Sequence, residues 1–147
     1  MRFVIIFIIF IMLIVSFYTF GGKMAKSRDG NKWRSESTST IYNLTDGQKF
    51  ELENKSKDGD SEASFRLYQY YCFTINNIDE QLRYLEISAS QGNIIAQYNY
   101  GIYLSNTNPT FSKYYDLDKA IYWMGLASKN GDIGAQNKLQ ELKKLKN

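Results

Sequence analysis

Histidine is absent from this chain of 147 residues, and cysteine occurs once, as Cys72. Without histidine the chain lacks the commonest general base and the commonest metal ligand. A single cysteine cannot form an internal disulfide, which excludes a small secreted domain held together by such bonds. Cys72 lies in an aromatic run, and we expect it to be a small buried hydrophobic residue.

The usual catalytic motifs are also missing from the sequence. It has no Gly-x-Ser-x-Gly turn, no phosphate-binding glycine loop and no Cys-x-x-Cys pair. The acidic pairs Asp79-Glu80 and Asp116-Asp118 stand at predicted helix starts, where capping and the helix dipole account for them. We therefore predict no catalytic residue, no metal site and no cofactor, and we expect that the protein is not an enzyme.

The formal net charge of +3 is unevenly distributed along the chain. Five basic residues and one acidic residue lie between Lys23 and Arg34, whereas 12 basic and 13 acidic residues follow from Asp46 onward. Proteins that bind nucleic acid normally present a basic face. The near-neutral region after Asp46 therefore predicts no nucleic-acid partner.

An apolar run spans residues 3–20 and is nearly long enough to cross a bilayer. Residues 1–20 are predicted to be a signal peptide or a membrane anchor. The run is longer than a typical signal core and has a poor cleavage site, which favours the anchor. Residues 21–45 are polar and contain few large apolar side chains, so we predict a flexible tether there.

The two signals for membrane orientation disagree. Basic residues just after an apolar span favour a cytoplasmic domain by the positive-inside rule. An N-terminal apolar segment in a small chain more often directs export of the rest of the chain. We expect a periplasmic protein, or one anchored in the inner membrane and facing the periplasm, with the orientation left open.

Three glycines introduce one recurring pattern, Gly-polar-x-x-Ala, at Gly59, Gly92 and Gly131. The spacings of 33 and 39 residues are typical of helical repeat arrays. Large residues follow each alanine by four and seven positions, which places them on one helix face. A second helix recurs before the glycines, with Tyr84 and Trp123 at equivalent positions. Each unit is therefore expected to be two helices followed by a glycine turn.

Helices are predicted over residues 46–57, 61–73, 79–90, 94–104, 117–129 and 132–145. We expect one domain over 46–147, with repeat units at about 59–91 and 92–130 between capping helices 46–57 and 132–145. Phe50 is expected to be the apolar anchor of the first helix.

The second unit resembles the Sel1-like repeats, relatives of the tetratricopeptide repeats. The residues that carry the resemblance are Ala96, Tyr100-Gly101, Tyr103, Lys119-Ala120, Trp123, Ala127-Ser128 and Gly131. The first unit keeps Ala63, Leu67, Tyr70, Ala89 and Gly92, but has Tyr68 where the family prefers glycine and Gln81 where it prefers alanine. The resemblance implies an all-α fold, a short right-handed helix-turn-helix solenoid. Such repeats serve as general binding scaffolds.

In such a solenoid the first helix of each unit usually lines the concave face. The second unit also contains an insertion, residues 105–115, of a kind that often lies on a binding face. Its aromatic residues are either anchors for a partner or, for Phe111 and Tyr115, a cover over the helix ends. The predicted partner-binding residues are Arg66, Gln69, Gln97, Tyr98, Asn99, Phe111, Tyr114 and Tyr115.

The predicted function is a non-catalytic protein-binding module of the bacterial envelope. The resemblance to small exported Sel1-like proteins implies an immunity protein that neutralises a secreted toxic effector such as a phospholipase. A scaffold for an envelope complex is an alternative. A third alternative, of a different class, is a small-ligand binder or enzyme that uses the solenoid groove. It requires a deep pocket with convergent polar groups rather than a broad, shallow face.

Overall fold

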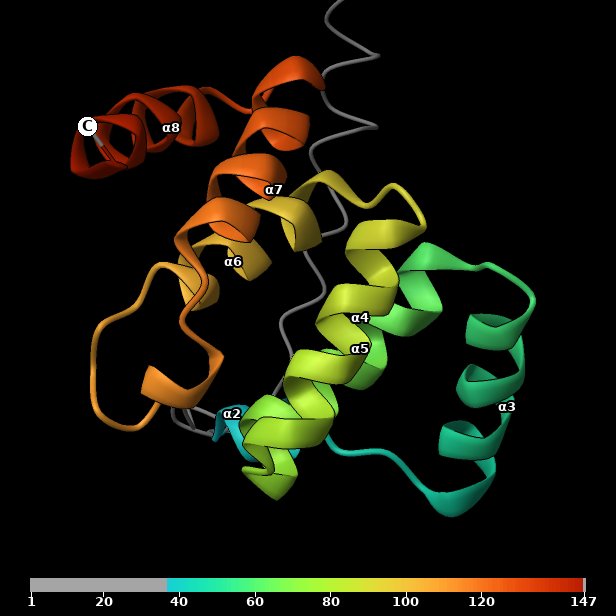
Figure 1. Ribbon diagram of the computed structural model, residues 1–147. Helices are drawn as coiled ribbons and strands as arrows, with labels where there is room; N and C mark the ends of the chain where they lie inside the picture. Colours follow the sequence, from blue (N-terminus) through green and yellow to red (C-terminus); the bar gives the residue numbers. More distant parts are fainter. Residues whose placement is uncertain (1–36, 147) are drawn as a thin grey trace, which may run out of the picture. The chain divides into compact units, whose positions relative to one another are not determined.

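The computed structural model describes residues 37–146 (Figure 1). The predicted signal peptide or anchor, residues 1–20, and most of the predicted tether lie outside the described residues. Within 37–146 no helix has both the length and the apolar character needed to cross a bilayer.

All regular secondary structure in the described region is helical, as the sequence predicts. A short helix comes first, α2 (Thr38–Ile41). Six longer helices follow, α3 (Asp46–Lys57), α4 (Ser61–Tyr70), α5 (Ile78–Ser90), α6 (Ile94–Leu104), α7 (Leu117–Lys129) and α8 (Ile133–Lys146). Each of the six packs against the next along the chain, as Figure 1 shows.

Three of the six helices have the predicted bounds, α5 begins one residue earlier than predicted, and α8 is shifted by one residue at both ends. The main difference is the helix predicted over 61–73. Its α-helical part ends at Tyr70 and continues as a π-helical turn, η1 (Tyr71–Ile75). Asn76 ends this turn in the left-handed conformation, with φ of 57°.

Glycine residues 59, 92 and 131 all adopt positive φ, between 95° and 98°. The residue after each glycine donates its backbone N–H to the carbonyl five positions before it. The N···O distances are 3.0 Å for Asp60, 3.1 Å for Asn93 and 3.0 Å for Asp132. This is the Schellman pattern, which closes a helix end and requires a residue that tolerates the left-handed region. Each glycine therefore terminates one helix.

The residue after each glycine starts the next helix. The side chains of Asp60, Asn93 and Asp132 accept the backbone N–H of the alanine three positions on, at 3.0, 2.9 and 2.7 Å. These alanines are buried, which lets the neighbouring helix approach. We call these three segments the glycine junctions.

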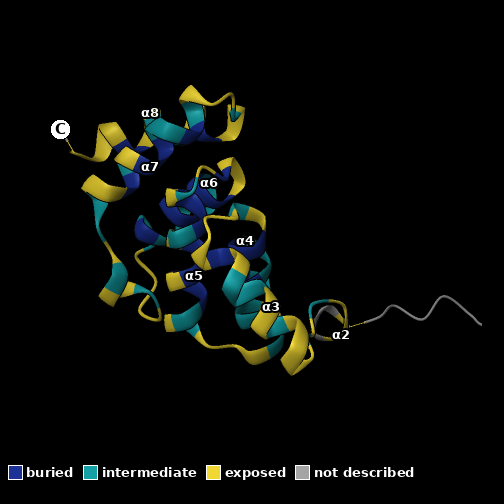
Figure 2. Ribbon diagram, turned by 90° about the vertical axis from the view of Figure 1, so that its right-hand side faces the viewer, coloured by how far each residue is buried: buried dark blue, intermediate teal, exposed yellow. Residues whose placement is uncertain are grey.

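The core is concentrated in α4, α5, α6 and α7, where Figure 2 shows most of the buried residues. Its fully buried large side chains include Leu67, Leu85 and Met124. Helices α6 and α7 approach closely at Gly101, where an added Cβ would lie 3.0 Å from Met124 Cε. A side chain at position 101 would therefore require Met124 to shift by a few tenths of an ångström.

Helix α3 is mostly exposed, and the sequence prediction of its anchor was wrong. Phe50 is 66% exposed. Leu52 packs partly against the core instead, and Ser56 is buried. Ser56 Oγ lies 2.7 Å from Ser64 Oγ on α4, so Leu52 and this polar contact, rather than Phe50, attach α3 to the core.

The end of the predicted tether is attached to the helical region. Arg66 on α4 donates to the backbone carbonyls of Tyr42 and Asn43 at 3.0 and 3.3 Å. The Tyr42 ring stacks on Phe73 with 4.7 Å between the centroids. The packed region therefore begins before Asp46, where the sequence placed the domain boundary.

Candidate functional site

Helix α6 carries apolar side chains on two faces and has no charged residue. Its core face is formed by Ala96, Gln97, Tyr100, Gly101 and Leu104, all buried. The opposite side, which we call the α6 face, is formed by Ile95, Tyr98, Asn99 and Ile102. The last three are half-buried and Ile95 is 58% exposed. The spacing of three, four and seven residues places these four side chains in one stripe.

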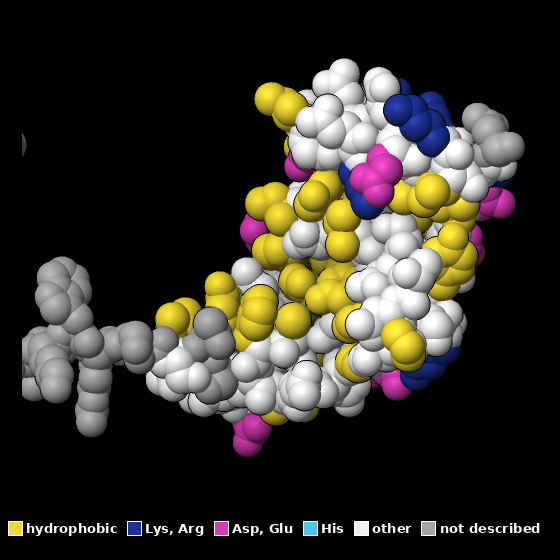
Figure 3. All heavy atoms as spheres, turned by 90° about the vertical axis from the view of Figure 1, so that its left-hand side faces the viewer, with side chains coloured by type: hydrophobic (Ala, Val, Ile, Leu, Met, Phe, Trp, Pro, Cys, Tyr) yellow, Lys and Arg dark blue, Asp and Glu magenta, His cyan; other side chains and the backbone are white. Residues whose placement is uncertain are grey.

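Helix α8 borders the α6 face at Gly134. A Cβ added at Gly134 would lie 3.4 Å from the Tyr98 ring, so the tyrosine packs against the first turn of α8. Figure 3 views the side on which α6, α8 and the α6–α7 connection lie in Figure 1, and hydrophobic side chains gather there in a hollow. This region is the candidate site.

The connection between α6 and α7, residues 105–116, forms the second part of the candidate site. It contains a short 3-10 turn, η2 (Ser112–Tyr114). The Phe111 ring packs on Tyr103 of α6, with 5.2 Å between the centroids, whereas Tyr115 is 44% exposed. Of the two arrangements left open by the sequence, Phe111 folds back over α6 and Tyr115 stays accessible.

Asp79 on α5 fixes this connection. The Tyr114 hydroxyl donates to Asp79 Oδ1, and Lys113 Nζ lies 2.9 Å from the same oxygen. The Tyr114 hydrogen bond, followed by the one from Lys113, lowers the pKa of Asp79 below its ordinary value. We call this three-residue contact the Asp79 latch.

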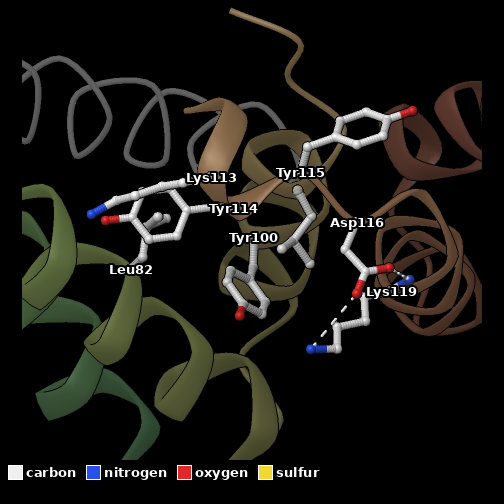
Figure 4. Close-up of a pocket in the computed structure, with 8 residues that line it drawn as sticks. Leu82, Tyr100, Lys113, Tyr114, Tyr115, Asp116 and Lys119 are labelled. Atoms are coloured by element: carbon white, nitrogen blue, oxygen red, sulfur yellow. Dashed lines mark hydrogen bonds and ion pairs between the residues drawn. The ribbon is translucent and has the colours of Figure 1, made fainter. Parts of the chain in front are cut away.

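A cavity of about 270 Å³ opens beside the latch (Figure 4). It is lined by Leu82, Tyr100, Leu104, Lys113, Tyr114, Tyr115, Asp116 and Lys119. Figure 4 shows Tyr115 turned away from the other lining side chains. The volume lies just below the roughly 300–1,000 Å³ that is usual for ligand pockets.

The charged groups around this cavity are already paired. Lys113 contacts Asp79, and Lys119 Nζ lies 3.7 Å from Asp116 Oδ2. Burial raises the pKa of Tyr100, so its phenol stays protonated at neutral pH. The cavity therefore offers a neutral hydroxyl and paired charges, a composition that suits a polar side chain or small polar group better than a strongly charged ligand.

Cys72 is half-buried rather than fully buried. Burial raises the pKa of its thiol, and the Tyr103 and Tyr68 hydroxyls act in the opposite direction. The thiol is therefore protonated at neutral pH, and only the thiolate is strongly nucleophilic. Among residues 37–146 no group of three or more histidine, cysteine, aspartate or glutamate side chains could hold a metal ion.

Gln97 lies in the interior, unlike most of the predicted partner-binding residues. It is 4% exposed, its amide donates to the Ala89 carbonyl at 3.1 Å, and its carbonyl accepts from Asn130 at 3.2 Å. Its side chain links three successive helices. The sequence held no signal for this placement, because Gln136 follows Ala135 as Gln97 follows Ala96 and is exposed.

Arg66 is half-buried, and its guanidinium binds the chain's own backbone at Tyr42 and Asn43. Gln69 is also half-buried on α4. The structure brings Tyr98 and Asn99 onto one stripe with Ile95 and Ile102, two residues that the prediction omitted. Their spacing from Tyr98 along the helix is the signal by which they could have been found.

The chain is 64% identical over 110 residues to the uncharacterized protein YibG of Escherichia coli (strain K12). The match covers 75% of this chain and 72% of that relative. This chain belongs to the YibG family. No family model and no solved structure matches the chain. The resemblance of this chain to Sel1-like repeats therefore rests on the residues named in the sequence analysis.

Proposed function

We propose that this chain is a non-catalytic protein-binding module that receives a protein partner on the α6 face. The observation that carries the proposal is the composition of α6, which leaves apolar side chains accessible on the side opposite its buried face. A helix of this kind is usually buried on both sides. A partner that covers Ile95 and Ile102 would complete that burial.

We further propose that helices α3–α8 form a short right-handed solenoid of Sel1-like repeats. Two findings support this architecture: the glycine junctions repeat one hydrogen-bond pattern, and each helix packs on its neighbour in sequence. Polar side chains also connect the two units, because Asn93 donates to Glu62 at 2.7 Å and Gln97 donates to the Ala89 carbonyl at 3.1 Å. Nearest-neighbour contacts of this type are typical of solenoids.

The chemistry of the α6 face favours an uncharged, apolar segment of the partner. Interface centres are depleted in charge and enriched in aromatic residues, and a few buried anchors carry most of the binding energy. Tyr98 and Ile102 would be the anchors, with Asn99 supplying a hydrogen bond. Tyr115 and the Asp79 latch would lie at the rim, where polar groups add specificity.

The identity of the partner is proposed from the resemblance alone. Small exported Sel1-like proteins include immunity proteins, so we propose a secreted toxic effector such as a phospholipase as the partner. The apolar run at residues 3–20 supports a site of action in the periplasm or at the inner membrane facing the periplasm. A scaffold for an envelope complex is the more general form of the same proposal.

A second candidate function rests on the cavity beside the Asp79 latch. Tyr100, Asp116 and Lys119 converge there and would bind a small polar ligand. The neutral phenol and the paired charges favour recognition over chemistry. Thermal melting of the full chain against small-molecule libraries would test it, since a ligand must raise the melting temperature of the native protein and lose that effect in Tyr100→Phe.

The primary proposal is tested by two matched variants of the tagged full chain. Ile95→Asp places a charge on the α6 face, and Ile133→Asp places one in the first turn of α8, where Ile133 is 74% exposed. An aspartate in a first helical turn suits the dipole, so both variants should fold. Each is used to capture partners from native cells, with quantification by mass spectrometry.

We expect Ile133→Asp to capture a dominant partner. The amount of this partner recovered with Ile95→Asp should be lower by roughly tenfold or more, as for a charge buried at an interface centre. Equal capture by both variants would remove the α6 face as the site. A partner whose toxic activity is abolished by the full chain would support the immunity function. A set of envelope proteins would support the scaffold.

A further inference from the structure

Two stretches of the sequence that lack charged residues meet at the end of the helical region where α2 lies. Residues 37–45 contain no charged side chain, and neither do residues 67–78. Charged residues make up 22% of the whole chain, and the longer uncharged stretch, residues 87–112, contains α6. The first stretch contains α2, and the second contains η1.

The two stretches are in contact. Helix α2 packs on η1, and the Tyr42 ring stacks on Phe73. Arg66 binds the carbonyls of Tyr42 and Asn43 and lies 5.5 Å from the Tyr42 ring centroid, which fixes the first stretch against α4. We call Ile41, Tyr42, Phe73 and Ile75 the uncharged corner.

Three large apolar side chains of the corner face outward. Ile41 is 53% exposed, Phe73 is 41% exposed and Ile75 is 47% exposed. The wider π-helical turn of η1 interrupts the α-helical register of α4, and Asn76 then reverses the chain in the left-handed region. An irregular turn of this kind often marks a functional position, because regular helix would be the more stable alternative.

The sequence before Ser37 indicates what would cover this corner. Sixteen residues separate the apolar run 3–20 from Ser37, a reach of at most about 55 Å. Five of the residues between Lys23 and Arg34 are basic. Basic residues beside an apolar segment attract anionic phospholipid headgroups, and tyrosine prefers the level of those headgroups.

We propose that the uncharged corner docks on the surface of an anionic phospholipid bilayer. Ile41, Phe73 and Ile75 enter the headgroup region, and Tyr42 lies at its edge. The lack of charge in both stretches is what permits this contact, since a charged side chain would resist leaving water. The corner involves none of the residues of the α6 face, so this inference stands apart from the proposed partner site.

The test uses the full chain with Cys72→Ser and one new cysteine, which carries an environment-sensitive fluorophore. Ile75→Cys reports on the corner, and Ile133→Cys is the control at an exposed isoleucine of α8. Each labelled protein is combined with vesicles of phosphatidylethanolamine and phosphatidylglycerol that carry a nitroxide quencher on the headgroup. Circular dichroism checks that both variants are folded.

We expect quenching at position 75 to exceed that at position 133 by roughly threefold or more, as for a residue held at the headgroup level. Adding Phe73→Ser and Ile41→Ser should remove the difference, whereas Phe50→Ser, at another exposed phenylalanine, should keep it. Equal quenching at both positions would overturn the proposal, as would failure of the chain to float with the vesicles. A shift at position 75 that depends on protein concentration without lipid would assign the corner to a second copy, and would also overturn it.

Discussion

The glycine junctions repeat one hydrogen-bond pattern three times, whereas the two connections within the helix pairs differ from each other. Helix α4 leads to α5 through the π-helical turn η1, and α6 leads to α7 through residues 105–116. The junctions are closed by backbone bonds and short capping side chains. The connections expose Phe73, Ile75 and Tyr115.

The difference shows where this fold tolerates variation. A junction must end one helix, start the next and set the angle between them, so its backbone has few solutions. A connection needs only to span two helix ends, and loops accept insertions at small cost. Both proposed binding surfaces draw on the connections, the uncharged corner through Phe73 and Ile75 and the rim of the α6 face through Tyr115.

Substitution at the central glycine junction should give the largest effect. Gly92 has φ of 98°, and a β-branched residue is strained there. Gly92→Val should lower the free energy of unfolding by about 3 kcal/mol, the upper end for a non-glycine residue held in such a conformation. Urea denaturation measures this.

The matched control is Gly125→Ala. Gly125 lies inside α7, and a Cβ added there meets no atom within 4 Å. Alanine should stabilise the helix by about 0.5–1 kcal/mol. If both variants changed stability equally, the special role of the junctions would be refuted.

An intermediate loss of stability is expected when Gln91 is replaced, because its side chain links the central glycine junction to the first one. Gln91 donates to the Ser56 carbonyl at 2.7 Å and accepts from the Ser64 hydroxyl at 2.6 Å, which joins α3 and α4 to the end of α5. Gln91→Ala removes both hydrogen bonds and should cost about 1–2 kcal/mol. Thermal or urea unfolding gives the value.

Asn130 provides the comparison for this prediction. It stands before Gly131 as Gln91 stands before Gly92, but it is exposed and makes one bond of 3.2 Å to Gln97. Asn130→Ala removes one bond, the one to the buried Gln97 carbonyl, and should cost about 0.5–1 kcal/mol, less than the loss of two bonds in Gln91→Ala. A larger loss for Asn130→Ala than for Gln91→Ala would show that the junctions do not differ in this way.

The smallest effect is expected at the Asp79 latch, and it depends on pH. The pKa of Asp79 is lowered in the folded protein by Tyr114 and then by Lys113, so the latch contributes above the ordinary pKa of about 3.9 and is lost as pH falls through the lowered value. The carboxyl carbon resonance of Asp79 should therefore titrate below its ordinary pKa.

Tyr114→Phe should bring that titration back toward the ordinary value, because the largest cause of the shift is removed. Amide exchange in residues 105–116 should become faster in this variant, while exchange at the glycine junctions should stay unchanged. An unchanged titration in Tyr114→Phe would show that this hydroxyl does not hold the connection.

Much of the fold was predictable because it depends on local features. Positions of glycine, capping residues and apolar periodicity indicate where helices begin and end, and these fixed α3, α6 and α7 to the residue. The sequence also indicated Tyr98 and Asn99 as neighbours on one helix. The π-helical turn was not predictable, because it continues the helical pattern of α4 and differs only in register.

The candidate site was less predictable because burial of a polar residue depends on its partners in space. Gln97 looks like a surface residue in sequence, yet Ala89 and Asn130 satisfy its amide in the interior. Arg66 looks like a contact residue, yet it binds backbone carbonyls that lie more than twenty positions earlier. Phe50 looks like an anchor and is exposed.

The sequence by itself determined the all-helical class, the glycine junctions and the buried alanines, because each depends on conformational preferences within a few residues. The tertiary structure decided which polar side chains became structural and brought residues 37–45 against residues 67–78. That meeting of two uncharged stretches depends on contacts between distant segments, which no local pattern contains. The uncharged corner therefore exists only in the folded protein.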